Sequence, residues 1–338
     1  MRMDRPMNHR WVEDEDGLRE LARSLDSGSQ LALDSESNSG FAYDERLCLL
    51  QINDGRGLWL IDLLTLPGGQ GALDGIRPFL EDPGYEIQLH GGEFDVGCLK
   101  RDYQVGLAGI WDSQQAASFL GWEKTGYGAV VEKICGVVLP KAHTRHDWSQ
   151  RPVEGEELQY AINDVRYLPD IAAALHELVE QADLEEEVGI ACRTVEQATW
   201  NGGFKPDAFW SLKGARQLPE ASQGVLMALY TWREKVAREL DLPAGRAMHN
   251  EVLLALARNP PRRADGLKRL GVPRRIAANW STELLSVIAA ARRDPPAVPP
   301  LPPRRPHDPR VQKRADRLKK WRRAEAARRD VPMQVVLP

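Results

Sequence analysis

The chain has 338 residues, of which 42% are hydrophobic and 28% are charged, and its formal net charge is −4. This length is enough for two domains and a further short piece. No apolar stretch approaches the roughly eighteen residues of a membrane span, and charges near the N-terminus exclude the apolar core of a signal peptide, so we expect a cytoplasmic protein that does not contact a membrane.

The first half of the chain predicts strands that first pair and then alternate with helices. An amphipathic segment predicts a helix that ends at Gly28, and a strand follows over 30–36. The other predicted elements are strands over 47–54, 57–64 and 85–90, helices over 70–81 and around Asp95, a short strand before Asp112 with a helix from Ser113, and a helical run over 154–181. The tight turn 54–57 and the alternation predict an α/β domain with a mixed sheet over residues 1–185.

The second half of the chain predicts helices. Residues 186–221 form a mixed connector, and apolar residues then recur at helical spacing over 222–293, which predicts a small bundle with its own core. A proline-rich linker over 294–309 leads to a basic tail over 310–338. Such a tail suits an electrostatic anchor for RNA, although basic tails are often merely solvated.

Four acids and one tyrosine stand where an α/β fold gathers ligands. Asp34 and Glu36 end a strand and share one face of it, because side chains alternate along a strand. Asp95 opens a helix after another strand, and Tyr160 precedes Asp164 by one helical turn. Strand ends and the adjacent helix starts converge on one edge of such a sheet, so we expect these side chains to surround one cleft.

Clustered carboxylates repel one another, and a cation between them relieves that repulsion. Oxygen ligands of this kind suit two magnesium or manganese ions. Two ions about 3.5 to 4 Å apart stabilise the attacking and the leaving oxygen when a phosphodiester is displaced in line. The phenol of Tyr160 is a poor base at neutral pH, so we assign it to the positioning of water rather than to its deprotonation.

Three motifs resemble those of the DEDD superfamily of exonucleases in its tyrosine branch. They are DSE at 34–36, HGGEFD ending at Asp95, and YAINDVRYL with Tyr160 and Asp164; Gln159 stands where the histidine branch has His. The segments between them resemble the ribonuclease D family, and 222–293 is similar to the HRDC domain that this family shares with RecQ-type helicases. The resemblance covers most of the chain in the family's domain order. The tail 310–338 looks like the start of a second HRDC-like repeat.

The resemblance implies a ribonuclease H-like mixed-sheet exonuclease domain followed by an all-α HRDC-type bundle. It implies a 3'-to-5' exoribonuclease that trims tRNA precursors or other structured RNAs and releases nucleoside 5'-monophosphates, with Asp34, Glu36, Asp95 and Asp164 as metal ligands. Two alternatives stay open: the same chemistry on single-stranded DNA, and an RNA-binding scaffold without catalysis. The oligomeric state is not fixed by the sequence, and we favour a monomer.

Several other residues have weaker signals. We expect Glu93 to be solvated, Asp112 to cap the helix that begins at Ser113, and His90 to be packed and hydrogen-bonded. Basic residues surround an aromatic in one loop, which suits phosphate contact and base stacking, with Arg145 the best candidate. The alternative is a solvated loop whose Trp148 packs onto the domain. The candidate RNA-binding residues are Lys141, Arg145, Trp148 and Arg151.

Overall fold

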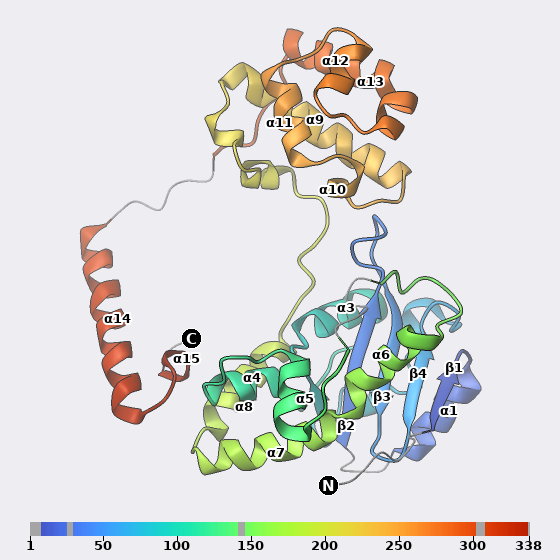
Figure 1. The fold of residues 1–338 in the computed structure, drawn as a ribbon, viewed down its shortest axis with the longest axis vertical. Coiled ribbons are helices and arrows are strands. Elements are labelled where there is room, and N and C mark those ends of the chain that lie inside the picture. Colours follow the sequence, from blue (N-terminus) through green and yellow to red (C-terminus); the bar gives the residue numbers. More distant parts are fainter. Residues whose placement is uncertain (1–7, 26–29, 141–145, 302–307, 337–338) are drawn as a thin grey trace. The chain divides into compact units, whose positions relative to one another are not determined.

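The computed structural model describes residues 8–25, 30–140, 146–301 and 308–336. Their contacts divide the chain into two compact units, shown in Figure 1. The first unit lies within residues 1–38, 46–200 and 307–338, and the second lies within 39–45 and 201–306. None of the helices in the described ranges combines the length and the apolarity that crossing a membrane requires.

The first unit is built on a six-stranded sheet in the order β1-β4-β3-β2-β5-β6. Its strands are β1 (His9–Val12), β2 (Gln30–Ser37), β3 (Leu47–Asn53), β4 (Leu58–Asp62), β5 (Glu86–Leu89) and β6 (Ile110–Asp112). The β2–β3 and β3–β4 pairs are antiparallel, whereas β1–β4, β2–β5 and β5–β6 are parallel. This confirms the predicted mixed sheet. Strand β1 was not predicted, because its four residues become a strand only through pairing with the distant strand β4.

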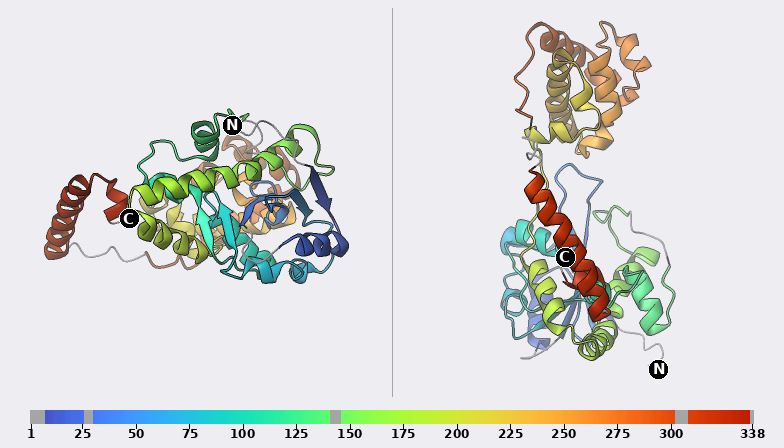
Figure 2. Two further views of the ribbon diagram at one scale, coloured as in Figure 1. Left: turned by 90° about the horizontal axis from the view of Figure 1, so that it is seen from below. Right: turned by 90° about the vertical axis from the view of Figure 1, so that its left-hand side faces the viewer.

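Strand β2 lies inside the sheet, and its alternation separates two layers of core. Leu31 and Leu33 pack in one hydrophobic cluster, and Ala32 packs in another together with residues of helix α6 (Gly155–Arg166). Helix α6 contacts β2, β3 and β4 and lies across this face of the sheet (Figure 2). Because Asp34 and Glu36 continue the alternation of Ala32, they emerge on the α6 side of the sheet.

Before residue 200 the first unit has eight helices within the described residues, and the helix over residues 127–135 was not predicted from the sequence. They are α1 (Glu15–Ser24), α2 (Arg77–Leu80), α3 (Glu93–Tyr103), α4 (Ser113–Phe119), α5 (Tyr127–Cys135), α6, α7 (Leu168–Gln181) and α8 (Glu185–Glu196). The predicted helix over 70–81 is wrong: only a 3₁₀ turn at Gly69–Gly71 and the single turn of α2 form there. Glycines at 68, 69, 71 and 75 make a continuous helix costly.

The first unit extends beyond the predicted boundary at residue 185. Helix α8 buries Val188, Cys192 and Val195 in the same core as β5 and α4. The backbone N–H of Asp112 in β6 also donates to the Cys192 sulfur at 3.3 Å. Local periodicity identifies α8 as a helix but cannot tell which core will receive its apolar face.

The second unit is helical, as predicted. Its helices are α9 (Glu220–Glu239), α10 (Ala244–Ala247), α11 (Asn250–Arg258), α12 (Ala264–Arg269) and α13 (Arg274–Arg293). Phe209, Trp210 and Leu218 from the predicted connector are buried in this core. The later part of that connector therefore belongs to the second unit, and only its first part belongs to the first unit.

The basic tail forms helix α14 (Pro309–Arg329) and the short helix α15 (Met333–Val336). Asp308 caps α14, since its side chain accepts a hydrogen bond from the backbone N–H of Arg310. This described part of the tail is one long helix followed by a turn, and it is not a bundle of its own.

Candidate active site

The two acids of β2 lie at the end of a fully buried stretch of sheet. Asp34 stands opposite Gln51 of β3 in the antiparallel register, and a register shift falls between Glu36 and Ser37. The side chain of Ser35 points to the other face, where its hydroxyl donates a hydrogen bond to the Asp95 carboxylate. The strand thus presents two acids to α6 and uses the residue between them to hold a third.

Helix α6 brings Tyr160 and Asp164 to the same place. Its residues Ala161, Ile162 and Val165 are buried against the sheet, which fixes the rotation of the helix. The Tyr160 phenol donates a hydrogen bond to the Asp164 carboxylate. Ligand atoms of Asp34, Glu36 and Asp164 all lie within 4.8 Å of one another.

Asp95 is positioned by the turn between β5 and α3. Gly91 has φ +73°, and a Cβ atom on Gly92 would lie 2.5 Å from the Leu89 side chain, so both positions require glycine. The Asp112 carboxylate accepts hydrogen bonds from the N–H groups of Gly91 at 3.0 Å and Gly92 at 2.9 Å. These two hydrogen bonds hold the double-glycine turn against the Asp112 side chain.

The predicted acids and tyrosine surround one cavity of about 260 Å³. Its lining residues are Asp34, Ser35, Glu36, His90, Phe94, Asp95, Tyr127, Tyr160 and Asp164. The structure thus brings together all five residues that the sequence analysis placed at the catalytic cleft.

Burial and mutual repulsion dominate the electrostatics of this cavity. Burial first, and then the charges of the neighbouring acids, raise the pKa of Asp34 and of Glu36 well above the ordinary value. Burial raises the pKa of Asp95 to about 6 and that of Asp164 to about 7. Burial and the acids nearby also raise the pKa of Tyr160, so its phenol is protonated at neutral pH.

Oxygen donors of this kind fit hard divalent cations. Four carboxylates face one cavity, and their raised pKa values show that the folded chain holds them together at an electrostatic cost. A divalent cation would remove that cost, and carboxylate oxygens are the ligands that magnesium and manganese prefer. The donor set therefore supports divalent metal binding at this site.

Three residues with weaker sequence signals have the environments that we predicted for them. Glu93 is exposed, and the Asp112 carboxylate caps α4 by accepting from the N–H groups of Gln114 and Gln115. The His90 Nδ1 atom lies 2.8 Å from the Ser113 hydroxyl, and its ring packs edge-on against Tyr127. These residues support the walls of the cavity.

Four residues of the site were missed by the sequence analysis. Ser35 holds Asp95, Tyr127 lines the cavity and donates to the backbone oxygen of Asn163, and Phe94 lies at the rim with 45% of its surface exposed. Gln51 is fully buried opposite Asp34, and neither of its amide atoms has a hydrogen-bond partner among the described residues. Of these four residues, only Phe94 could have been found from the sequence, because it is an aromatic residue next to Asp95 in its motif.

The basic loop is described only in part. Lys141 and Arg145 lie outside the described residues. Trp148 is 3% exposed and packs in the cluster beneath α6, which is the structural alternative considered for it. The Arg151 guanidinium pairs with the buried carboxylate of Asp62 at 2.6 Å and donates to the backbone oxygen of Cys48 at 2.9 Å. Both side chains have partners inside the domain, and their contact with RNA stays a prediction.

We expect Arg151→Met to lower the free energy of unfolding by about 3 kcal/mol. Asp62 is 2% exposed, so losing the guanidinium leaves a buried carboxylate without its cation. Urea denaturation measures the change. Arg19→Met, which removes an exposed ion pair with Asp16, is the control and should stay within about 0.5 kcal/mol of the parent. A change below about 1 kcal/mol for Arg151→Met would show that Asp62 is solvated.

Comparisons with known proteins agree with this geometry. The sequence profile of the 3'-5' exonuclease family matches residues 9–180, and that of the HRDC domain matches residues 222–288. Ribonuclease D of Pseudomonas paraeruginosa is 30% identical over 310 residues, which cover 87% of this chain and 79% of that protein. Ribonuclease D of a Shewanella species is 31% identical over 77% of this chain, which spans 66% of that relative's length.

A solved structure has the same architecture. The crystal structure of Escherichia coli RNase D, described as an exoribonuclease involved in structured RNA processing, superimposes with a TM-score of 0.76 at 26% identity. The match covers 97% of this chain and 87% of that one. The similarity therefore extends across both units.

Proposed function

Because the chain belongs to the ribonuclease D family of 3'-5' exoribonucleases, we propose that it shortens RNA from the 3' end by a mechanism that uses two divalent ions. Magnesium or manganese are the ions that the donor set favours. The products are nucleoside 5'-monophosphates, and the substrates are tRNA precursors or other structured RNAs with a free 3' end. We keep the cytoplasm as the expected compartment.

The observation that carries this proposal is the cluster of carboxylates. Asp34, Glu36 and Asp164 offer ligand atoms within 4.8 Å of one another, and Asp95 faces the same cavity. When bound there, two cations would stabilise both the attacking and the leaving oxygen of an in-line displacement. A scaffold that had lost catalysis would have no reason to keep four repelling acids together, so the carboxylate cluster favours an active enzyme.

The chain's own side chains have separate tasks. The four carboxylates would hold the cations, and the hydrogen bond from Ser35 fixes the orientation of Asp95. Tyr160 keeps its proton and donates to Asp164, so it positions groups in the cavity and does not act as a base. The exposed ring of Phe94 offers a surface on which a terminal base can stack.

A time course with RNA labelled at its 5' end tests the proposal. The substrate has a 3' overhang, and the reactions contain magnesium, manganese or EDTA, with the matching DNA alongside. We expect a metal-dependent ladder that shortens by single nucleotides on RNA. A ladder of equal strength on DNA would support the alternative substrate, because only contacts to the 2'-hydroxyl separate the two. A folded protein that yields no ladder in any condition would support the scaffold.

We expect Tyr160→Phe to slow hydrolysis by about 10- to 100-fold, because the variant loses a positioning hydroxyl but no metal ligand. Single-turnover rates measure the loss, and stabilisation by manganese against heat should be unchanged. Tyr127→Phe is the matched control, since its hydroxyl lies in the same cavity wall but donates to a backbone oxygen. Equal losses for the two variants would mean that the Tyr160 hydroxyl has no special role.

A further inference from the structure

Helix α14 is the most strongly charged element that the catalytic site does not use. Its 21 residues include ten lysines or arginines and only two acids, Asp316 and Glu325. Side chains from residue 308 to residue 321 are exposed except for Ala315, which is half-buried. This density of positive charge contrasts with the chain's overall net charge of −4.

The C-terminal end of this helix is attached to the first unit. Ala326 and Val335 are buried, and Val335 belongs to the core cluster of that unit. The Arg329 guanidinium pairs with Glu187 of α8 at 2.7 Å. Figure 1 shows the turn from α14 to α15. A hydrogen bond from Arg322 to the backbone oxygen of Met333 at 2.8 Å closes this turn. The cationic side chains therefore lie on a helix whose C-terminal end is packed against the first unit and whose N-terminal part is exposed. We call this helix the arm.

The cationic side chains in the exposed part of α14, residues 310–321, repel one another. Like charges recur three or four residues apart, as in Arg310 with Arg314 and Lys313 with Arg317, and such pairs destabilise a helix. Within the described part of the chain, no tertiary packing offsets this repulsion over the first three turns of α14, where Val311 and Leu318 are 57% and 49% exposed. The exposed segment over residues 310–321 is short, and isolated helices below about 12 to 15 residues are marginal in water. A polyanion that neutralises the cations would stabilise the helix.

The arrangement of the side chains indicates which polyanion fits. Cations occupy most of the circumference of the helix, and its apolar residues form only the short stripe of Val311, Ala315 and Leu318. This stripe is narrower and shorter than the apolar face that membrane-surface helices require. Trp321 is its single aromatic residue, which is too few for the stacking surface that single strands use. Contacts from such a helix fall on phosphates, and a duplex presents phosphates at a higher charge density than a single strand.

We propose that α14 binds the phosphate backbone of a double-stranded stem while the 3' end of the same RNA lies in the catalytic cavity. This inference rests on the proposed function and adds the surface that contacts the double-stranded part of the substrate. Contact with the stem orders the arm and is independent of base sequence. RNA without a stem gains little from it.

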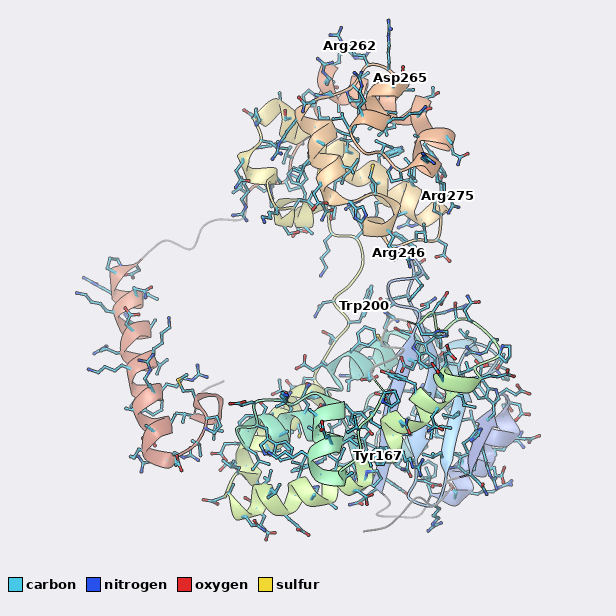
Figure 3. All side chains as sticks on the ribbon, in the orientation of Figure 1. Tyr167, Trp200, Arg246, Arg262, Asp265 and Arg275 are labelled. Atoms are coloured by element: carbon cyan, nitrogen blue, oxygen red, sulfur yellow. The ribbon has the colours of Figure 1, made fainter. Side chains whose placement is uncertain are left out.

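The test uses the full chain with Arg314, Arg317 and Arg323 replaced by Gln. The control replaces Arg262, Arg275 and Arg292, three exposed arginines of the helical unit, by Gln; Figure 3 labels the first two. Neutralisation is preferred to deletion, since deletion would uncover the core that Val335 closes. Binding of a stem-loop RNA with a 3' overhang and of a short single strand is measured across salt concentrations in EDTA. Turnover of the single strand is measured with magnesium.

We expect the α14 variant to bind the stem-loop RNA about tenfold or more weakly and its salt dependence to become shallower by about one unit of slope per lost contact. Its turnover of the single strand should equal that of the parent and of the control. Amides of α14 should exchange hydrogen more slowly when the stem-loop is bound. If the parent cleaves neither RNA but stem binding still depends on α14, the proposed function fails, and only the contact between α14 and the stem is retained.

Three outcomes would overturn the assignment. The first is unchanged affinity of the α14 variant for the stem-loop. The second is an equal loss for the control variant, which would show that net charge and not this helix sets the affinity. The third is α14-dependent binding to vesicles with anionic lipids that exceeds binding to the stem-loop.

Discussion

Replacing Asp34 by Asn should reduce the rate of RNA hydrolysis by about 10³-fold or more. The substitution keeps the shape of the side chain but removes the charge that holds a cation. Loss of a single stabilising group at a reacting centre costs about 10² to 10³ in rate, and the loss of a metal ligand also misplaces the cation and the groups around it. Single-turnover rates at saturating magnesium measure the effect.

The same substitution should not weaken the fold. Burial and three neighbouring acids raise the pKa of Asp34. Its ionised carboxylate therefore destabilises the folded protein when no metal is bound. A neutral amide relieves that repulsion, and the variant should unfold in EDTA at a temperature equal to or above that of the parent. Activity and stability then change in opposite directions, which separates a ligand from a structural acid.

Glu93→Gln is the matched control, because Glu93 is exposed two residues before Asp95. It should leave the rate unchanged. Normal hydrolysis by Asp34→Asn would refute the assignment of Asp34 as a metal ligand, and a lower unfolding temperature in EDTA would show that its carboxylate is structural.

The sequence could predict the site because its geometry is local. Asp34 and Glu36 share a face through strand alternation, and Tyr160 and Asp164 share one through the helical turn. Only the meeting of β2, α3 and α6 is long-range, and the general rule that strand ends gather at one edge of an α/β sheet supplied it. The structure gathers these residues around one cavity, and their roles as ligands await the experiments above.

What the sequence could not show depends on contacts between distant residues. Arg151 and Asp62 are 89 residues apart, so a loop arginine that looks available for phosphate is instead paired with a buried acid. In the sequence, Gln51 is a single polar residue within an apolar strand. Only the register of the strands places it opposite Asp34. Strand β1 likewise needs β4 as its partner.

The stability of the exonuclease unit should depend on pH and on divalent metal together. In the absence of metal, burial raises the pKa of Asp95 to about 6 and that of Asp164 to about 7, both above the ordinary value of an aspartate. The folded chain therefore binds more protons than the unfolded chain between about pH 4 and pH 7. The contribution of these two carboxylates to stability in EDTA is therefore greatest below their ordinary pKa and is lost as the pH rises through this window.

Divalent ions should restore the stability that is lost as the pH rises. They bind the deprotonated carboxylates, so protons compete with them at low pH and not at high pH. At about 100 times the dissociation constant a ligand adds about 2.7 kcal/mol, which for a unit of this size raises the unfolding temperature by about 5 to 10 °C. We expect this gain at pH 8 and a much smaller one at pH 5.

Thermal unfolding at both pH values, with EDTA, magnesium or manganese, measures the linkage. Asp34→Asn is the informative variant, because it should gain stability in EDTA at pH 8 and lose most of the gain from metal. A shift that is equal at both pH values would place metal binding on groups other than these carboxylates. If magnesium and manganese do not change the unfolding temperature at pH 8, the four acids do not form a metal site. The cluster would then have to bind a different ligand.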